Sequence, residues 1–372
     1  MGLVHTEREE LLRAVEAEVG AGRPFALATI VGTSGSTYRR AGARLLVTAD
    51  GTWLGNLSGG CLEGEVIDVG LRVIDRDEAE LAAYDLSADE EAIWGWGMGC
   101  NGAIDVLVEP ARTAVEAAEG LREAERSGRP HVLASVVSSP DVAPGTHLLV
   151  REDGTVSGGL PETLAAAVTE ASLTALSSGA STRVDVDGTD VFLEVVRPPL
   201  RLVVCGAGHD AVPLVRAAGA LGWAVTVVDD RSSFLTPERF PGAAGLVRAE
   251  PADAATAVGA DDDTFVVVMS HNFVRDVDYL GSFLGTGCAY LGVLGPGRRL
   301  ERLLDELATR GATPTAEDRE RLHGPAGLDL GAEGPDEIAA AICAEVLAVR
   351  RGHGGGFLRD RGGAIHRRGA GA

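Results

Sequence analysis

Apolar residues recur along the first half of the chain with the spacings of short strands and amphipathic helices. Steps of three and four residues predict helices, and apolar runs bounded by glycine turns predict strands. The elements predicted here are helix 7–19, strands 24–31, 44–48, 52–57, 81–86 and 103–109, helix 114–126, strands 131–137 and 147–151, helix 162–176, and strands 183–186 and 191–196. Several of these strands form hairpins, so we expect an N-terminal α+β domain.

The second half alternates strands and helices. The pattern predicts strand 200–205, helix 211–221, strands 224–228, 245–249 and 264–269, helix 274–284, strand 289–294, and helices 298–310 and 336–349. This alternation is typical of parallel α/β sheets, so we expect a Rossmann-like C-terminal domain.

Changes in composition suggest where the domains meet. Pro198-Pro199 is a plausible boundary because prolines interrupt regular structure. We expect an N-terminal domain over residues 1–110, a middle α/β extension over 111–197, the Rossmann-like domain over 198–351, and a disordered, glycine- and arginine-rich tail over 352–372. The middle segment shows no cluster of reactive residues, so a structural extension or an oligomer surface is its expected role.

Composition and charge restrict the classes of partner. The 372 residues are 45% hydrophobic and carry a formal net charge of −22, which argues against nucleic acid or an anionic membrane as a partner. No apolar stretch is long enough to span a bilayer, and the charged first ten residues do not resemble a signal peptide, so we expect a cytoplasmic protein. All 33 basic residues are arginine, so a single arginine carries less meaning than usual.

Five cysteines are scattered along the chain without a CxxC pair, which argues against disulfides and structural zinc. Cys205, Cys288 and Cys343 fall in apolar elements and are expected in the core. Cys61 instead follows the turn Ser58-Gly59-Gly60, and apolar residues at helical spacing follow it. We expect Cys61 in the first turn of a helix, where unpaired N–H groups and the helix dipole favour a thiolate.

Such a thiol suits a nucleophile, a sulfur carrier or a ligand for a soft metal, and the alternative is a buried cysteine that acts as a small hydrophobe. The loop before the first hairpin contains Arg39, Arg40 and Arg44 and is a candidate anion site that the hairpin brings near Cys61. A solvated connection is the alternative for this loop. Cys100, in a second glycine-rich turn, could face the same ligand, although tryptophan and glycine also make such turns through packing alone.

The second half contains a dinucleotide-type turn. Gly206-Ala207-Gly208-His209 lies between a strand and a helix, and Asp229 ends the next strand at the offset of a ribose-binding carboxylate. His209 is unusual where a pyrophosphate approaches the helix, and it is a candidate phosphate contact. His271 lies in another loop that follows a strand, at the sheet edge where ligands bind.

The ordered motifs of this chain resemble the xanthine dehydrogenase accessory factors, the XdhC/CoxI family. These motifs are residues 35–40, residues 58–63, the turn at Cys100 with Glu109-Pro110, residues 206–209, and residues 325–332 followed by residues 335–339. The resemblance implies a protein that binds molybdenum cofactor, assists its sulfuration with a cysteine desulfurase, and delivers it to a xanthine dehydrogenase-type hydroxylase. It also implies that Cys61 holds molybdenum or assists sulfuration, and that the arginine loop holds the terminal phosphate of the cofactor.

Three hypotheses follow. The first is a stoichiometric molybdenum cofactor chaperone, plausibly a homodimer, whose Rossmann half binds NAD, another nucleotide or part of the cofactor. The second is an NAD(P)-dependent oxidoreductase that uses residues 200–300, in which Asp229 favours NAD. The third is a structural adaptor with a vestigial dinucleotide pocket. The first explains the thiol and arginine residues of the N-terminal half, which the second does not.

Overall fold

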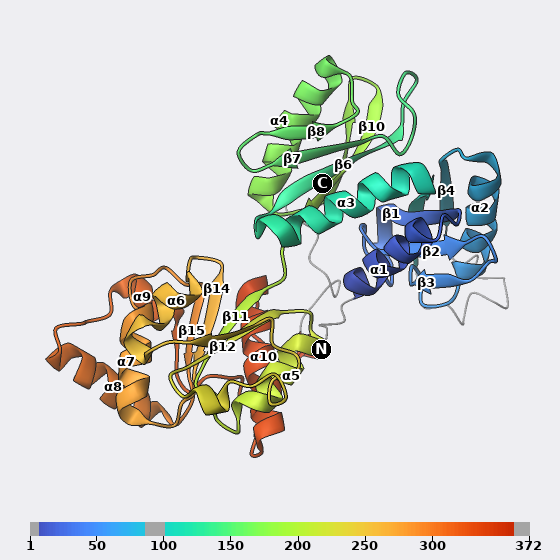
Figure 1. Ribbon diagram of the computed structural model, residues 1–372. Coiled ribbons are helices and arrows are strands. Elements are labelled where there is room, and N and C mark those ends of the chain that lie inside the picture. The colour runs from blue at the N-terminus through green and yellow to red at the C-terminus, as the bar shows by residue number, and fades with distance from the viewer. Residues whose placement is uncertain (1–6, 86–100, 361–372) are drawn as a thin grey trace. The chain divides into compact units, whose positions relative to one another are not determined.

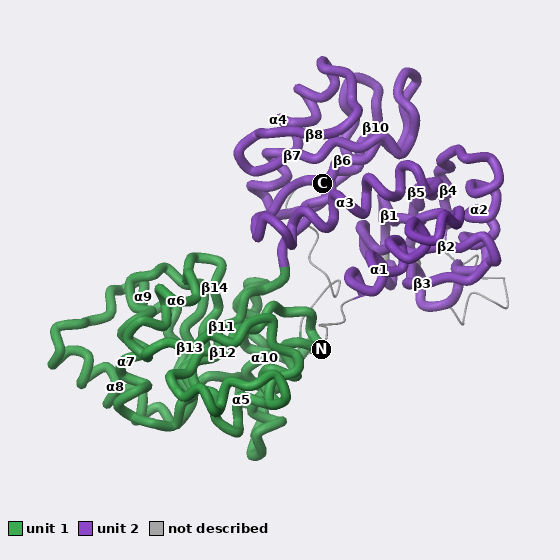
Figure 2. The backbone as a smooth tube through the Cα atoms, in the orientation of Figure 1, with its two compact units in different colours: residues 1–6, 199–363 green, residues 7–198, 364–372 purple. Residues whose placement is uncertain are grey.

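The computed structural model describes residues 7–85 and 101–360, and these residues form two compact units. The first unit is Glu7–Pro198 and the second begins at Pro199, as the two colours of Figure 2 show. Of the tail expected to be disordered, residues 361–372 lie outside the described residues. Each unit is described below by itself.

The N-terminal unit consists of two halves with the same order of elements. The first half contains α1 (Glu7–Gly20), β1 (Phe25–Ser36), β2 (Arg44–Thr48), β3 (Trp53–Gly55), α2 (Glu63–Arg76), β4 (Glu80–Asp85) and β5 (Asn101–Pro110). The second contains α3 (Ala111–Ser127), β6 (His131–Ser138), β7 (His147–Arg151), β8 (Val156–Gly158), α4 (Glu162–Ser178), β9 (Thr182–Val186) and β10 (Thr189–Val196). Both sheets are antiparallel, with the equivalent orders β3-β2-β1-β5-β4 and β8-β7-β6-β10-β9 (Figure 1). The α+β character expected for this region is confirmed.

The strand registers of the two halves also match. In the first half Thr29 pairs with Arg44, and in the second half Ser135 pairs with His147. Leu27 pairs with Glu109 in the same way as Leu133 pairs with Glu194. The sequences agree with this match: Gly-Arg-Pro at 22–24 recurs at 128–130, and Leu-Leu-Val at 45–47 recurs at 148–150. The segment 111–197, expected to be a plain extension, therefore repeats the fold of the first half.

Strand alternation gives each sheet two apolar faces. Ala26, Ala28 and Ile30 of β1 pack with α2, and the equivalent face of the second sheet packs with α4. The opposite residues of β1, Phe25 and Leu27, pack with α1 and α3 in a core that also includes residues of the second half. This shared core joins the halves.

Two buried ion pairs cross between the halves at equivalent positions. The Arg44 guanidinium binds the Glu194 carboxylate, and Nε2 of His147 lies 2.8 Å from Oε1 of Glu109. Burial lowers the pKa of His147, but the Glu109 carboxylate outweighs this effect and raises it. Because removing one partner leaves a buried charge uncompensated, such pairs constrain how the halves associate.

The C-terminal unit is a six-stranded parallel sheet with the order β13-β12-β11-β14-β15-β16, which is the doubly wound Rossmann order. Its elements are β11 (Arg201–Cys205), α5 (Ala211–Ala220), β12 (Ala224–Asp229), β13 (Gly245–Arg248), α6 (Ala254–Val258), β14 (Thr264–Val268), α7 (Phe273–Phe283), β15 (Tyr290–Val293), α8 (Gly297–Thr309), α9 (Ala316–Arg321), β16 (Leu322–His323) and α10 (Pro335–Arg351). The Rossmann-like expectation is confirmed, whereas the short elements α6, α9 and β16 were not predicted.

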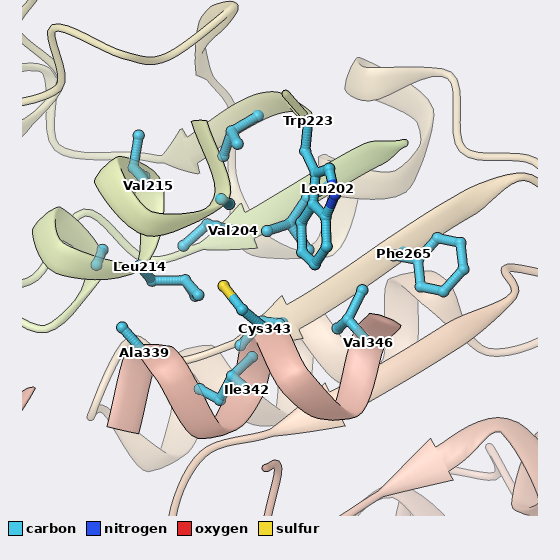
Figure 3. Packing of buried hydrophobic residues seen from close by; sticks show 14 of the residues in the cluster. Leu202, Val204, Leu214, Val215, Trp223, Phe265, Ala339, Ile342, Cys343 and Val346 are labelled. Atoms are coloured by element: carbon cyan, nitrogen blue, oxygen red, sulfur yellow. The ribbon is translucent and has the colours of Figure 1, made fainter. Parts of the chain in front are cut away.

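Helices cover both faces of this sheet. On one face, residues of α5 and α10 pack against β11, and Figure 3 shows Leu214, Ile342 and Cys343 beside Leu202 and Val204. On the other face, α7 and α8 pack on a second cluster that includes the two remaining thiols of this unit. All three cysteines expected in the core are buried.

Candidate functional site

One buried carboxylate organises the turn before α2. Oε1 of Glu63 accepts hydrogen bonds from the backbone N–H groups of Leu57 and Ser58, at 3.1 and 2.9 Å. Its Oε2 accepts from the Ser58 hydroxyl at 2.6 Å and from the N–H groups of Gly60 and Leu62 at 2.9 and 3.2 Å. Burial would raise the pKa of Glu63, but these hydrogen bonds outweigh it and lower the pKa to about 2. The turn therefore encloses an ionised carboxylate from its own chain.

Cys61 lies on the outside of this turn. Its side chain is exposed, and its backbone N–H donates to Oγ of Ser58 at 3.0 Å. Two sequence expectations are therefore wrong: α2 begins at Glu63, so that Cys61 precedes the helix, and the N–H groups of the turn are occupied rather than unpaired. The alternative of a buried, hydrophobe-like cysteine is also excluded. Cys61 is therefore an accessible thiol on a turn whose backbone is fixed by hydrogen bonds to the buried Glu63 carboxylate.

The arginine loop reaches this turn through an aromatic residue. A Cβ added to Gly59 would lie 3.5 Å from the ring of Tyr38, which is itself 63% exposed. Gly60 has a φ of +113°, and a Cβ added there meets nothing within 4 Å. The loop and the Cys61 turn thus meet, as expected, through Tyr38 and Gly59, and there is open space at Gly60, next to Cys61 in the chain. Sequence reasoning missed Tyr38 and Glu63; an acidic residue in the first helical turn was the available signal for Glu63.

The three candidate arginines have different environments. Arg39 pairs with Glu7 of α1 at 2.7 Å. Arg44 is buried in its pair with Glu194, so it is not free to bind a surface ligand. Arg40 is exposed, and among the described residues it shows no ion pair. Cys100 lies outside the described residues.

The candidate residues of the Rossmann unit gather at the carboxyl edge of the sheet. Gly206 has a φ of +108°, and a Cβ added to it would lie 2.6 Å from Cα of Ser270, so the two loops that follow β11 and β14 require glycine there. A Cβ on Gly208 would meet only the His271 ring, at 3.8 Å. His271 also approaches Asp210, with Nε2 3.0 Å from Oδ2. His209 is exposed beside these residues.

Asp229 is closed off from this edge. Its side chain is 1% exposed. The N–H of Ala207 donates to Oδ2 at 2.7 Å, and the Arg231 guanidinium donates to both oxygens at 2.8 and 2.7 Å. Burial would raise the pKa of Asp229, but the hydrogen bonds from Arg231 and Ala207 lower it to about 2. The carboxylate is therefore already satisfied and has almost no surface to offer a ribose hydroxyl.

Two general features bear on the kind of ligand. Among the described residues no group of three or more His, Cys, Asp or Glu side chains is arranged to hold a metal ion. The described helices also include none that is long and apolar enough to cross a bilayer. Any metal bound at Cys61 would therefore need ligands other than a preformed protein cluster in this part of the chain.

These features define an α/β protein in which a Rossmann-type unit follows a duplicated α+β unit with an exposed thiol. Residues 202–346 match the XdhC Rossmann domain, and residues 19–85 and 124–187 match the XdhC and CoxI family. The latter two segments end with β4 and β9, which are equivalent strands of the two halves. The chain belongs to the XdhC and CoxI family.

Three relatives extend this comparison. The chain is 32% identical to a Bacillus subtilis protein described as a probable xanthine dehydrogenase subunit, over 94% of this chain and 98% of that protein. It is 24% identical to the molybdenum cofactor insertion chaperone PaoD of Escherichia coli, over 94% of this chain and 90% of that protein. A crystal structure from Bacillus halodurans, described as a xanthine dehydrogenase, superposes with a TM-score of 0.74 at 29% identity and covers 92% of this chain and 96% of that one.

Proposed function

We propose that this protein binds molybdenum cofactor as cargo at the Cys61 turn, assists its sulfuration, and delivers it to a xanthine dehydrogenase-type hydroxylase. The observation that carries the proposal is an exposed thiol on a turn fixed by Glu63, with open space at Gly60. Family membership and the name of the PaoD relative support the choice of cargo. Thiolate sulfur is a soft ligand, which suits a metal that exchanges oxygen for sulfur.

The residues fit the metal end of this cargo better than its phosphate end. Cys61 can approach a bulky ligand, but the N–H groups beside it already bind Glu63, so they offer little to an anion. Arg40 is exposed near Tyr38 and is the available cation of the loop. In this proposal the protein acts stoichiometrically as a homodimer, a cysteine desulfurase supplies the sulfur, and the Rossmann unit binds NAD or another nucleotide without a ribose contact from the buried Asp229.

The competing hypothesis is an NAD(P)-dependent oxidoreductase. It requires a ribose contact that favours NAD, and Asp229 was the candidate for that contact. Because Asp229 is buried and bonded to Ala207 and Arg231, it argues against this hypothesis. Dehydrogenase activity with small alcohols or aldehydes, at a rate that Cys61→Ala does not change, would favour the oxidoreductase hypothesis.

The test is retention of the cargo by purified full-length protein. Wild type, Cys61→Ser and Thr163→Ser are incubated with molybdenum cofactor, passed through a desalting column, and analysed for molybdenum and for oxidised pterin. Thr163 is a matched control because it is exposed and lies at the start of the equivalent helix of the second half. We expect Cys61→Ser alone to lose molybdenum, with unchanged thermal unfolding. Equal retention by all three proteins contradicts the proposed site.

Delivery and sulfuration are tested separately. Wild-type protein loaded with cofactor in the presence of a cysteine desulfurase and cysteine is expected to carry cyanide-labile sulfur and to activate an apo hydroxylase. If loaded protein activates the hydroxylase no faster than free sulfurated cofactor does, the delivery role is wrong even where binding holds. Sedimentation at micromolar concentration tests the homodimer, for which twice the chain mass is expected.

A further inference from the structure

Tyr38 presents an aromatic ring to solvent beside the Cys61 turn. It is 63% exposed, whereas Tyr279 and Tyr290 are fully buried and Tyr84 packs against the core between β1 and α2. A single exposed aromatic residue is by itself an ordinary feature of protein surfaces. The contacts of Tyr38 distinguish it, because they cover one face of its ring and fix the backbone on either side.

One face of the Tyr38 ring rests on the turn that carries the thiol. A Cβ added to Gly59 would lie 3.5, 3.5 and 3.7 Å from three adjacent ring carbons, Cδ1, Cε1 and Cγ. Because these distances are nearly equal, this point lies over the face of the ring; an approach in the plane of the ring would leave Cγ much farther away. Gly59 has a φ of +82°, a conformation that favours glycine. The turn therefore backs the ring with glycine backbone.

The opposite face of the ring is free in the described part of the chain. No aromatic ring or guanidinium there stacks on Tyr38. Since Gly59 covers one face, the exposed 63% of this residue includes the other face. Tyr38 thus offers a flat surface of the size and polarity that planar heterocycles stack on.

The backbone around Tyr38 is held before any ligand binds. Oγ1 of Thr37 donates to the carbonyl oxygen of Arg39 at 2.8 Å, a bond that spans Tyr38. One terminal nitrogen of Arg39 binds both carboxylate oxygens of Glu7 in α1 at 2.7 Å. A ring that is already fixed loses little conformational entropy when a ligand stacks on it. The equivalent connection of the second half, residues 137–144, has no aromatic residue, so the shared sheet does not need this ring.

The ring and the thiol are neighbours. Gly59, on which the ring rests, and Cys61 are two residues apart, which limits their Cα atoms to a separation of about 7 Å. Between them a Cβ added to Gly60 would meet nothing within 4 Å. Tyr38 and Cys61 are therefore close enough to contact different parts of one elongated ligand.

We propose that the free face of Tyr38 is a stacking platform for the pterin of the molybdenum cofactor. Aromatic side chains stack on flat heterocycles of many kinds, so the ring defines the class of ligand, and the choice of pterin rests on the proposed function. The pterin is the ring system joined to the dithiolene that holds the metal, so it must lie near a metal that Cys61 binds. The nucleobase of a dinucleotide form is also planar, but it lies beyond the phosphates, at the end remote from the metal.

The first test is equilibrium dialysis of full-length protein against 6-hydroxymethylpterin, measured by its fluorescence. Tyr38→Phe keeps the aromatic face and should bind within twofold of wild type. Tyr38→Leu keeps apolar bulk without that face and should bind about tenfold more weakly. The matched control is Phe357→Leu, which removes a ring that is 70% exposed in the other unit and should leave the affinity unchanged.

Three results of this dialysis would overturn the platform. The first is wild-type protein that does not bind the pterin at millimolar concentration. The second is binding by Tyr38→Leu that equals wild type. The third is an equal loss in Tyr38→Phe and Tyr38→Leu, which would assign the contact to the hydroxyl instead of the ring face.

Nucleotide probes identify the ring that stacks. Cytidine and guanosine monophosphates should bind no more weakly to Tyr38→Leu than to wild type. If Tyr38→Leu weakens the binding of either nucleotide and spares that of 6-hydroxymethylpterin, Tyr38 stacks on a nucleobase and the assignment to pterin is overturned.

Cofactor retention separates this inference from the proposed function. After desalting, Tyr38→Leu is expected to retain less pterin than wild type, with unchanged thermal unfolding. If Cys61→Ser loses molybdenum and Tyr38→Leu retains as much pterin as wild type, the proposed function stands and the platform is overturned. If Tyr38→Leu loses pterin and Cys61→Ser keeps its molybdenum, the platform stands and the role proposed for the thiol is wrong.

Discussion

Replacing Glu63 by glutamine tests whether one buried carboxylate holds the Cys61 turn. The side chain is 6% exposed and accepts five hydrogen bonds from the turn that precedes it. Glutamine has nearly the same shape but only one acceptor oxygen, and its NH₂ group would face N–H donors. The change therefore removes charge and acceptors while it leaves packing almost unaltered.

The magnitude follows from the pKa. A value of about 2, against an ordinary 4.5, corresponds to about 3 kcal/mol of preference for the ionised form. Because glutamine keeps part of the bonding, we expect Glu63→Gln to cost the turn about 2–3 kcal/mol at neutral pH. Each 1.4 kcal/mol is a factor of about ten, so local opening should become roughly 30- to 150-fold more frequent.

The assay is hydrogen exchange of the amides of Ser58, Gly60 and Leu62, because a chain with two compact units has no single unfolding free energy. The folded pKa lies below the unfolded value, so the stabilisation is complete above about pH 5 and is lost as pH falls toward 2. Glu65→Gln, on the exposed side of the same helical turn, is the matched control and should exchange like wild type.

Two results would refute this reasoning. One is exchange in Glu63→Gln that stays within twofold of wild type at pH 7. The other is an equal loss of protection, relative to the intrinsic exchange rate at each pH, in wild type and variant when the pH is lowered from 6 to 3, since the variant has no carboxylate to protonate at this position.

The remaining predictions concern the two units separately. Gly206→Ala should severely destabilise the Rossmann unit in urea, because the added Cβ would lie 2.6 Å from the backbone of Ser270. Gly208→Ala, whose Cβ would lie 3.8 Å from the nearest atom, should cost under about 1 kcal/mol. Equal effects of the two variants would contradict the close approach of the loops after β11 and β14. Because Glu109 raises the pKa of His147, the stability of the N-terminal unit should fall as pH rises above about 6.5, and His147→Gln should abolish that slope in thermal unfolding scans. Among the described cysteines, iodoacetamide should label Cys61 alone in the native protein, and peptide mapping that finds the buried thiols labelled equally fast would contradict their burial.

The Rossmann unit could be predicted from the sequence because its evidence is local. The strand, the Gly206 turn and the helix after it are adjacent in the chain, and the acid Asp229 lies one strand later. The sequence could not show whether the Asp229 carboxylate is free or already hydrogen-bonded within the protein. Arg231 is only two residues away, yet a pattern of residue types does not show that its guanidinium and the Ala207 N–H occupy the carboxylate.

The duplication was harder to detect because its evidence is distributed. Periodicity predicts that a segment is a strand but does not show its partner, and the ion pair of Arg44 with Glu194 joins residues 150 positions apart. Glycine and helical spacing are local signals, so they located a turn followed by a helix at Cys61, but they placed the helix start too early, because α2 begins at Glu63. The expectation of unpaired N–H groups at this turn was wrong because the Glu63 side chain bends back and accepts hydrogen bonds from them.

The internal repeat also shows which connections of the first half are longer than the shared fold requires. Between Ile30 and Gly42 the first half has a longer connection than the second half has between Val136 and Gly145, although both close with the same backbone hydrogen bond, at 2.8 and 2.9 Å. The second half also begins its helix sooner after β8, with three residues between Gly158 and Glu162, whereas seven residues separate Gly55 of β3 from Glu63 of α2. Because the shorter connections suffice for the same sheet, the sheet itself does not require the added residues of the first half, among them Tyr38, Arg39 and Cys61, and loop residues that a fold does not need are where binding sites are usually found.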